Sequence, residues 1–347
     1  MILFLVIFVI ITALVFDFTN GFHDAANAIA TCVSTRALKP RTALIMAGVM
    51  NMVGALLGTE VAKTIGDGII DISQFSDSPV PEDNLHGLVI IMAALIGAIA
   101  WNLITWWFGL PSSSSHALIG GLAGAGLASV TKVQWWGIID HVIIPMFVSP
   151  FIGFIISFVV LSFILKLLQN RPYHRTMRRF RRAQIFSSAA MALGHGLQDA
   201  QKTMGVIVLA LLAFQYEGLR DVGGELVIPF WVKFAAALAI SLGTLAGGGR
   251  IMRTLGKKVF KVEPVHGFVA EGVSASVLYF TAYIFHAPVS TTQVVSSAIM
   301  GVGATKRLSA VSWGVAGNIL IAWVLTLPAA GAFSALCYQL LHLFLQY

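Results

Sequence analysis

The stretch Gly21-Phe22-His23-Asp24-Ala25 returns as Gly196-Leu197-Gln198-Asp199-Ala200, which is 175 residues further along the chain. Other landmarks follow in the same order at nearly the same spacing: Leu85-His86-Gly87 matches Val265-His266-Gly267, Pro111–His116 matches Pro288–Gln293, and Trp136-Gly137 matches Trp313-Gly314. A shared order at one spacing indicates an internal duplication. The fold should therefore consist of two copies of one unit.

The composition places both copies in a membrane. Of the 347 residues, 57% are hydrophobic and only 11% are charged, whereas a soluble domain has roughly a quarter charged residues. Apolar stretches reach the length of about 20 residues that a membrane helix needs. Examples are 88–110, 142–168, 229–246 and 311–345. The ten-residue segments of alternating apolar and polar residues that indicate a β-barrel are not present in the sequence. We predict an all-α polytopic membrane protein of about ten to twelve segments, with 1–16 as a retained membrane segment and not a signal peptide.

The charges between the apolar stretches indicate the orientation of each copy. Residues 169–184 form a basic linker, which the preference of Lys and Arg for cytoplasmic loops places in the cytoplasm. Residues 60–83 are acidic but their counterpart 250–263 is basic, and the basic turn 36–41 matches the acidic stretch 216–225. We therefore expect two inverted repeats, 1–168 and 185–347, with both chain ends extracytoplasmic. The net charge of +7 is then a topology signal, and no nucleic-acid partner is expected.

Asp24 and Asp199 are the strongest candidates for function. An ionisable side chain at membrane depth is energetically costly and is by default a functional candidate. Each occupies the same place in its repeat, beside amide or imidazole groups: His23 and Asn27 in the first half, Gln198 and Gln201 in the second. Carboxylate and amide oxygens at a helix break suit a small hard cation or a proton. The alternative is a pair of helix caps that face a loop.

The second pair of motifs places Pro and several hydroxyl residues directly before a Gly-rich apolar helix. Such a helix start offers free backbone N–H groups and hydroxyl donors at the positive end of the helix dipole. Two starts that approach from opposite sides of the membrane would form an anion cage for phosphate or sulfate. The alternative is helix packing through hydroxyls. The proposed contacts are Ser113, Ser114, Ser115, Ser290, Thr291 and Thr292.

In combination, these four motifs resemble the inorganic phosphate transporter (PiT) family, and the resemblance covers nearly the whole chain. The family implies re-entrant hairpins that carry the two Ser/Thr-rich helix starts, with phosphate bound between the halves. By position, the resemblance makes Asp24, Asn27 and Asp199 ligands of the coupling ion and the six hydroxyl residues phosphate contacts.

The chain departs from the family's sequence pattern at positions that bear on the coupling ion. The position that matches Asn27 in the second half is Lys202, and an ammonium cannot ligate sodium. Lys202 lies three residues after Asp199, within reach of its carboxylate on a helix. His23 stands where sodium-coupled members tend to have Asn. Both features resemble the bacterial low-affinity, proton-coupled branch, which is thought to take up a neutral metal–phosphate complex. We favour H⁺ over Na⁺ and expect neither a resident cofactor nor a resident metal.

The other polar candidates are weaker. His116 and its counterpart Gln293 begin the two hairpin helices, where His116 is either a phosphate or proton ligand or a packing histidine. Glu271 lies in an apolar stretch and is either a proton relay or the partner of a Lys or Arg. We group Gln201 and Glu271 with the coupling-ion residues.

The sequence thus predicts a phosphate:proton symporter, with a sodium-coupled symporter or a sulfate permease of the same fold as alternatives. An enzyme is not expected, since the only local pair, Ser113 with His116, has Gln293 in place of the histidine in the duplicate. The expected partners are inorganic phosphate, H⁺ or Na⁺, and the lipid of a bacterial inner membrane. A homodimer is left open.

Overall fold

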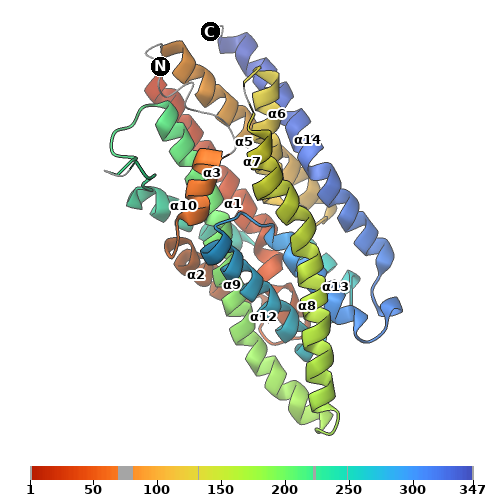
Figure 1. Ribbon diagram of the computed structural model, residues 1–347. Coiled ribbons are helices and arrows are strands. Elements are labelled where there is room, and N and C mark those ends of the chain that lie inside the picture. Colours follow the sequence, from red (N-terminus) through yellow and green to blue (C-terminus); the bar gives the residue numbers. More distant parts are fainter. Residues whose placement is uncertain (1, 69–80, 132, 222–223, 248, 346–347) are drawn as a thin grey trace.

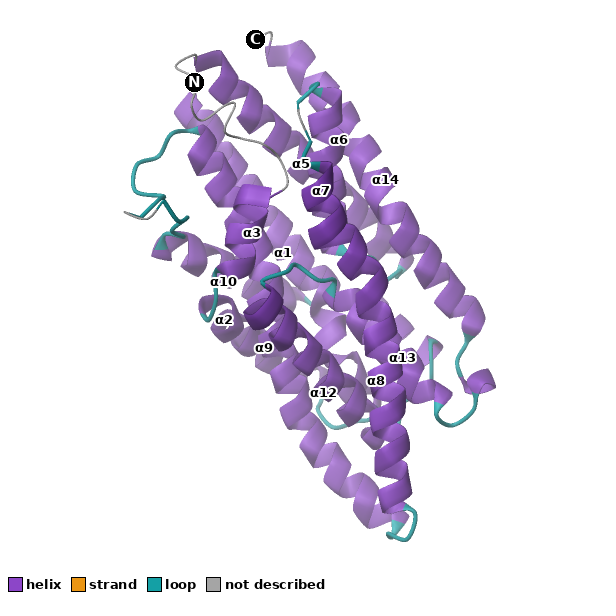
Figure 2. Ribbon diagram, in the orientation of Figure 1, coloured by secondary structure: helices purple, strands orange, loops and turns teal. Residues whose placement is uncertain are grey.

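The fold is described from a computed structural model over residues 2–68, 81–131, 133–221, 224–247 and 249–345. In these residues, helices joined by short loops make up nearly the whole structure (Figure 2). The long helices are α1 (Ile2–Ser34), α5 (Pro81–Phe108), α8 (Ile144–Leu168), α9 (Tyr173–Ala213) and α14 (Trp313–Leu345). The all-helical prediction is confirmed.

Shorter helices fill the space between the long ones. They are α2 (Pro40–Leu56), α3 (Glu60–Gly68), α6 (Ser114–Ala128), α7 (Trp135–Ile138), α10 (Phe230–Ala246), α11 (Gly249–Arg253), α12 (Pro264–Phe280) and α13 (Thr291–Ala304). π-helical segments cover Ile139–Ile143, Thr254–Lys258 and Thr281–Phe285, and a 3₁₀ turn covers Leu308–Ala310.

Five helices in the described part of the chain are long and apolar enough to cross a membrane. They are Ile2–Ser34, Leu85–Phe108, Phe147–Leu168, Pro264–Phe285 and Trp313–Phe344, and a bent pair, 230–246 with 249–258, makes a sixth if it is one span. This count is below the predicted ten to twelve. The difference arises because α2, α6 and α13 are short and because α9 has basic first turns and further polar residues within 198–202, in its middle.

The expected helix breaks at the two aspartates are absent. Helix α1 runs without interruption through Asp24, and α9 does the same through Asp199, so neither residue is a helix cap. The glycines before them serve close packing instead. A Cβ at Gly21 would lie 2.3 Å from the Ile240 carbonyl oxygen of α10, and one at Gly196 would lie 2.2 Å from the Asn51 oxygen of α2. Packing against a neighbouring helix thus outweighs the weak local helix propensity of these segments.

The two chain ends lie at one end of the molecule, and the turn between α8 and α9 lies at the other (Figure 1). Only residues 169–172 form that turn, because 173–184 are already the first turns of α9. This arrangement agrees with the predicted topology, but the side of the membrane remains a prediction. Within the acidic stretch 60–83, residues 69–80 lie outside the described residues.

The two halves are interlocked. Helix α6 of the first half packs against α14, and α13 of the second half packs against α8. Similarly, α1 packs against α10 while α9 packs against α2. Such reciprocal contacts are what a two-fold relation would produce, and the inversion itself stays a prediction. They bring α1, α9 and the starts of α6 and α13 together at the centre.

Candidate functional site

Each hairpin helix begins with a capped, extended segment. After α5, Gly109 turns the chain at φ 68°, and the Ser113 hydroxyl accepts a hydrogen bond from the His116 N–H at 3.3 Å. In the second half, His286 adopts φ 51°, and the Ser290 hydroxyl accepts from the Gln293 N–H, also at 3.3 Å. Ser113 and Ser290, both predicted phosphate contacts, are therefore the N-caps of α6 and α13.

The two helix starts meet at the paired aspartates. Asp24 Oδ2 accepts from the Ser114 hydroxyl of α6 at 3.4 Å and from the Thr292 hydroxyl of α13 at 3.2 Å. Asp199 Oδ2 accepts from the Thr291 hydroxyl of α13 at 3.1 Å. The predicted convergence of the two Ser/Thr-rich starts on the aspartates is present in the structure.

Asn27 and Lys202 occupy matching places on opposite sides of this centre. Asn27 Nδ2 donates to the Thr292 hydroxyl at 2.9 Å, and Lys202 Nζ donates to the equivalent hydroxyl of the first half, Ser115, at 2.5 Å. The ammonium also donates to Asp199 Oδ1 and, at 3.0 Å, to the Val289 carbonyl oxygen. The predicted Lys202–Asp199 contact is thus present, and Lys202 has an acceptor for each of its three N–H bonds.

Two histidines extend the centre, and sequence analysis identified only one of them. His23 Nδ1 lies 2.5 Å from Asp24 Oδ1, while its Nε2 lies 3.3 Å from the hydroxyls of Thr105 and Ser112. The histidine that sequence analysis missed is His195, whose Nε2 lies 3.0 Å from Asp199 Oδ2. Its spacing of one helical turn before Asp199 was the available signal. The symmetry argument missed it because its counterpart is Asn20.

The hydrogen bonds around His195 define which ring nitrogen is protonated. The Thr244 hydroxyl donates to the Ile240 carbonyl oxygen at 2.8 Å, so it accepts from Asn51 Nδ2 at 2.7 Å. Asn51 Oδ1 then faces His195 Nδ1 at 3.1 Å, and that nitrogen must donate. Nε2 of a neutral ring would direct a lone pair at the Asp199 carboxylate. A second proton on the ring, or a cation near Nε2, removes this repulsion.

The centre can therefore bind a positive charge. Ligand atoms of Asp24, His195 and Asp199 all lie within 4.8 Å of one another, and the three side chains are at most 1% exposed. With both imidazoles neutral, two carboxylates and one ammonium give a net charge of −1. Each added proton raises that charge by one, which makes the buried centre more favourable for an anion.

Gln201, His116 and Gln293 make no hydrogen bond to the paired aspartates. The Gln201 side chain accepts from the Val61 N–H at 2.8 Å and donates to the Leu197 carbonyl oxygen at 2.7 Å, so it caps α3. Buried polar atoms of His116 and Gln293, Nδ1 and Oε1, have no hydrogen-bond partner among the described residues. Both residues lie next to the centre in the first turns of α6 and α13.

Glu271 lies in a separate polar cluster. Its carboxylate is fully buried and accepts from four side chains of α1 and α9: Thr31, Gln184 at 3.2 Å, Ser187 at 2.6 Å and Ser188 at 2.7 Å. These partners are hydroxyls and an amide, so the alternative of a Lys or Arg partner does not hold among the described residues. Four hydrogen bonds therefore hold the Glu271 carboxylate, and none of them comes from a cationic side chain.

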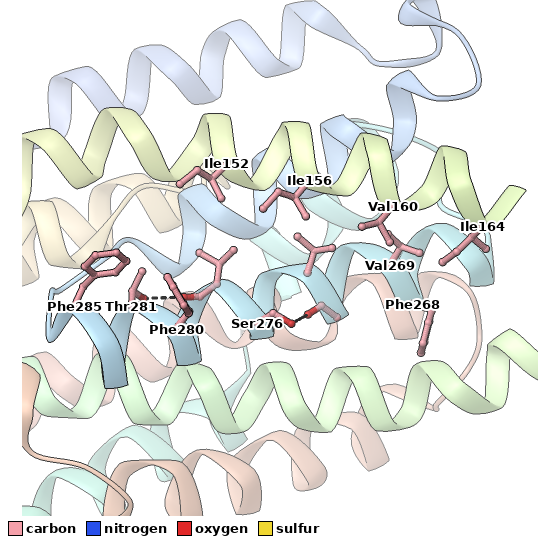
Figure 3. A pocket seen from close by; sticks show the side chains of 13 residues that line it. Ile152, Ile156, Val160, Ile164, Phe268, Val269, Ser276, Phe280, Thr281 and Phe285 are labelled. Atoms are coloured by element: carbon pink, nitrogen blue, oxygen red, sulfur yellow. Dashed lines mark hydrogen bonds between the residues drawn. The ribbon is translucent and has the colours of Figure 1, made fainter. Parts of the chain in front are cut away.

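A groove of about 730 Å³ between α8 and α12 is not the candidate site (Figure 3). Its lining carries no charged side chain and consists mainly of aliphatic and aromatic residues, among them Ile152, Ile156, Val160, Phe268 and Phe280. An unsolvated phosphate would find almost no donors there. The buried polar centre, which offers hydroxyl and ammonium donors, remains the candidate site.

The apolar helices and this centre define a multi-pass helical membrane protein with a buried, charged polar centre. A family model described as the phosphate transporter family matches residues 20–334, and the chain belongs to this family. It is 46% identical over 344 residues to a probable low-affinity inorganic phosphate transporter of Bacillus subtilis (strain 168), and the match covers 98% of each chain. It is 45% identical over 340 residues to a protein with the same description from Rhizobium meliloti (strain 1021), with 96% of each chain covered.

A solved structure, described as the sodium-dependent phosphate transporter, shares the fold. It superposes with a TM-score of 0.84 at 26% sequence identity, over 98% of this chain and 99% of that chain. The predicted family resemblance is confirmed by these comparisons.

Proposed function

We propose that this chain moves inorganic phosphate across the cell membrane together with protons. The observation that carries the proposal is the meeting of two hydroxyl-rich helix starts at a pair of buried carboxylates, one of which is held by Lys202. Helix N-termini and hydroxyls supply the donors that phosphate requires. Family membership supports phosphate as the substrate. The relatives described as low-affinity phosphate transporters support the same substrate.

The hydroxyl contacts suggest how the two substrates are coupled. A hydroxyl has a single proton to donate. While Ser114 and Thr292 donate to an ionised Asp24, they cannot donate to phosphate. A proton at the Asp24–His195–Asp199 centre weakens the acceptor and releases these donors. Proton binding and phosphate binding then favour each other, and this linkage is what symport needs.

Lys202 favours protons over sodium. Its ammonium occupies the place that corresponds to Asn27, and it already holds Asp199 and Ser115. A sodium ion there would meet a fixed positive charge and would lack an amide ligand. We infer that Asp24, His23, Asn27 and His195 form the side of the centre at which the proton binds.

Sodium coupling is the second candidate, because the solved structure that shares the fold is described as sodium-dependent. Asp24, His195 and Asp199 also offer oxygen and nitrogen ligands that suit a divalent metal carried with phosphate as cargo. A coupled sodium ion and a divalent metal carried with phosphate would both bind in the same centre as the proton.

Uptake of labelled phosphate into liposomes tests the proposal. A pH gradient, acidic on the side of uptake, should drive accumulation without sodium, and excess sulfate should not compete. Accumulation that needs sodium, or sulfate that competes as well as phosphate does, would refute proton-coupled phosphate transport. A chelator added to the same assay shows whether a divalent metal travels with the phosphate.

A further inference from the structure

Asp17 is a buried carboxylate that the proposed mechanism does not use. It lies in the middle of α1 at 0% exposure, and neither carboxylate oxygen has a hydrogen-bond partner among the described residues. Its neighbourhood is polar but unsatisfied. Both amide atoms of Asn20 and the hydroxyl of Thr203 on α9 are also buried without a hydrogen-bond partner among the described residues. Thr203 lies near Asp17, where its hydroxyl can turn to donate to the carboxylate. Three such side chains in one neighbourhood indicate a site for something that binds there.

An ionised carboxylate is strongly disfavoured in this position. Burial removes its hydration, and the nearby Thr203 hydroxyl and the charge of Lys202 offset only part of that loss. Glu271 shows the contrast, because that buried carboxylate accepts from four side chains. Asp17 must therefore carry a proton or a cation for much of the time.

The position of Asp17 relates it to the centre. Asp17, Asp24 and Thr31 are spaced by seven residues, so they lie along nearly the same face of α1, with about 10 Å between successive residues along the axis. Thr31 donates to Glu271. Buried acids therefore flank the Asp24 centre on both sides. Because α1 begins at the end of the molecule where the two chain ends lie (Figure 1), and Asp17 precedes Asp24 in α1, Asp17 lies on the side of the chain termini.

The charges around Asp17 favour a proton over a metal ion. From α9, Asp199 and Lys202 act on it electrostatically. Helix α10 carries only Lys233, two turns from Ile240 where α10 meets α1, and residues 87–108 of α5 carry no ionisable side chain. The Lys202 ammonium repels a metal ion at Asp17 but has little effect on a neutral carboxylic acid.

We propose that Asp17 is a proton-binding site on the terminus side of the phosphate centre, from which protons pass to Asp24. This inference rests on the proposed proton coupling. Asn20, one turn before Asp24 and with both amide atoms free, is placed to relay the proton or to hold a bridging water.

Infrared spectroscopy tests the site directly. In protein with ¹³C-labelled aspartate, we expect the carbonyl band of a protonated aspartic acid at neutral pH. Asp17→Asn should remove this band, and the exposed Asp140→Asn should leave it unchanged. An identical band in the Asp17→Asn protein would overturn the inference. If the Asp17→Asn protein does not insert, Asp17→Glu should move the band to the unlabelled frequency, and a band that stays at the labelled frequency overturns the inference.

Transport separates this inference from the proposed function. Asp17→Asn should lose accumulation driven by a pH gradient but keep phosphate counterflow, and Asp17→Glu should restore accumulation. Loss of counterflow as well would place Asp17 in the substrate site and overturn its role as a separate proton site. If the unsubstituted chain itself does not respond to a pH gradient, the proposed coupling fails, while the infrared band still decides whether Asp17 binds a proton.

Discussion

Replacement of Lys202 by asparagine tests the role of the tethered charge. The ammonium is 1% exposed and donates to Asp199, Ser115 and the Val289 carbonyl oxygen. Without it, the hydrogen bond from Thr291 remains on Asp199, beside the His195 ring. The variant should also restore the amide that Asn27 provides in the other half, and with it a ligand for a small cation.

The expected cost follows from the loss of one partner in a buried ion pair. Such a loss destabilises a protein by about 3–5 kcal/mol, because the remaining charge stays buried without compensation. A cation that binds the variant recovers part of this, since a ligand at about 100 times its Kd adds roughly 2.7 kcal/mol. Lys202→Asn should therefore be destabilised without sodium and stabilised when sodium is added.

Thermal unfolding in detergent and phosphate counterflow in liposomes, each with and without sodium, measure both effects. Lys63→Asn is the matched control, because Lys63 is 29% exposed and its pair with Glu60 lies at the surface, where such pairs contribute about 0–1 kcal/mol. The reasoning is refuted if Lys202→Asn unfolds like the control and shows neither a sodium response nor a weaker dependence on pH.

The remaining predictions concern acids and close helix contacts. Asp24→Asn and Asp199→Asn should each insert normally but lose driven phosphate uptake in vesicles; normal accumulation in both variants would exclude a coupling role. Glu271→Gln should lower stability by about 1–3 kcal/mol in thermal unfolding, because the new amide group faces hydroxyls that already donate to the carboxylate. If Glu271 relays protons, this variant should also lose uptake driven by a pH gradient, and unchanged uptake would leave it a structural role. Gly21→Ala should be destabilised by about 1–3 kcal/mol or more, since its Cβ would overlap the Ile240 oxygen, whereas Gly272→Ala, with open space around it, should unfold like the unsubstituted protein.

The sequence predicted the centre well because its chemistry is duplicated. Two Ser/Thr-rich helix starts and two aspartates at equal spacing indicated that these elements meet, and Lys202 was recognisable as a charge within reach of Asp199. The expectation of helix breaks beside the aspartates was wrong. Gly21 and Gly196 lie within continuous helices and pack closely against neighbouring helices.

Residues that act through tertiary contacts were not predictable in this way. Gln201 is adjacent to the centre in sequence, but its side chain turns toward the backbone of α3. His195 and Asp17 have counterparts of a different kind, Asn20 and Ala192, so a search for repeated features passed over them. The side chains that donate to Glu271 come from α1 and α9, which are distant in sequence, so the residues around Glu271 do not predict them.

The crosswise packing of α6 on α14 and of α13 on α8 has a mechanical consequence. The first-half helix α6 packs on α14, the last helix of the second half, and the second-half helix α13 packs on α8, the last helix of the first half. A tilt of either half would therefore also move the Ser/Thr-rich helix of the other half. In the transport that we propose, opening toward one side of the bilayer would shift both helix starts together. Such a displacement would expose a bound anion and would weaken the hydrogen bonds from the hydroxyls to the aspartates.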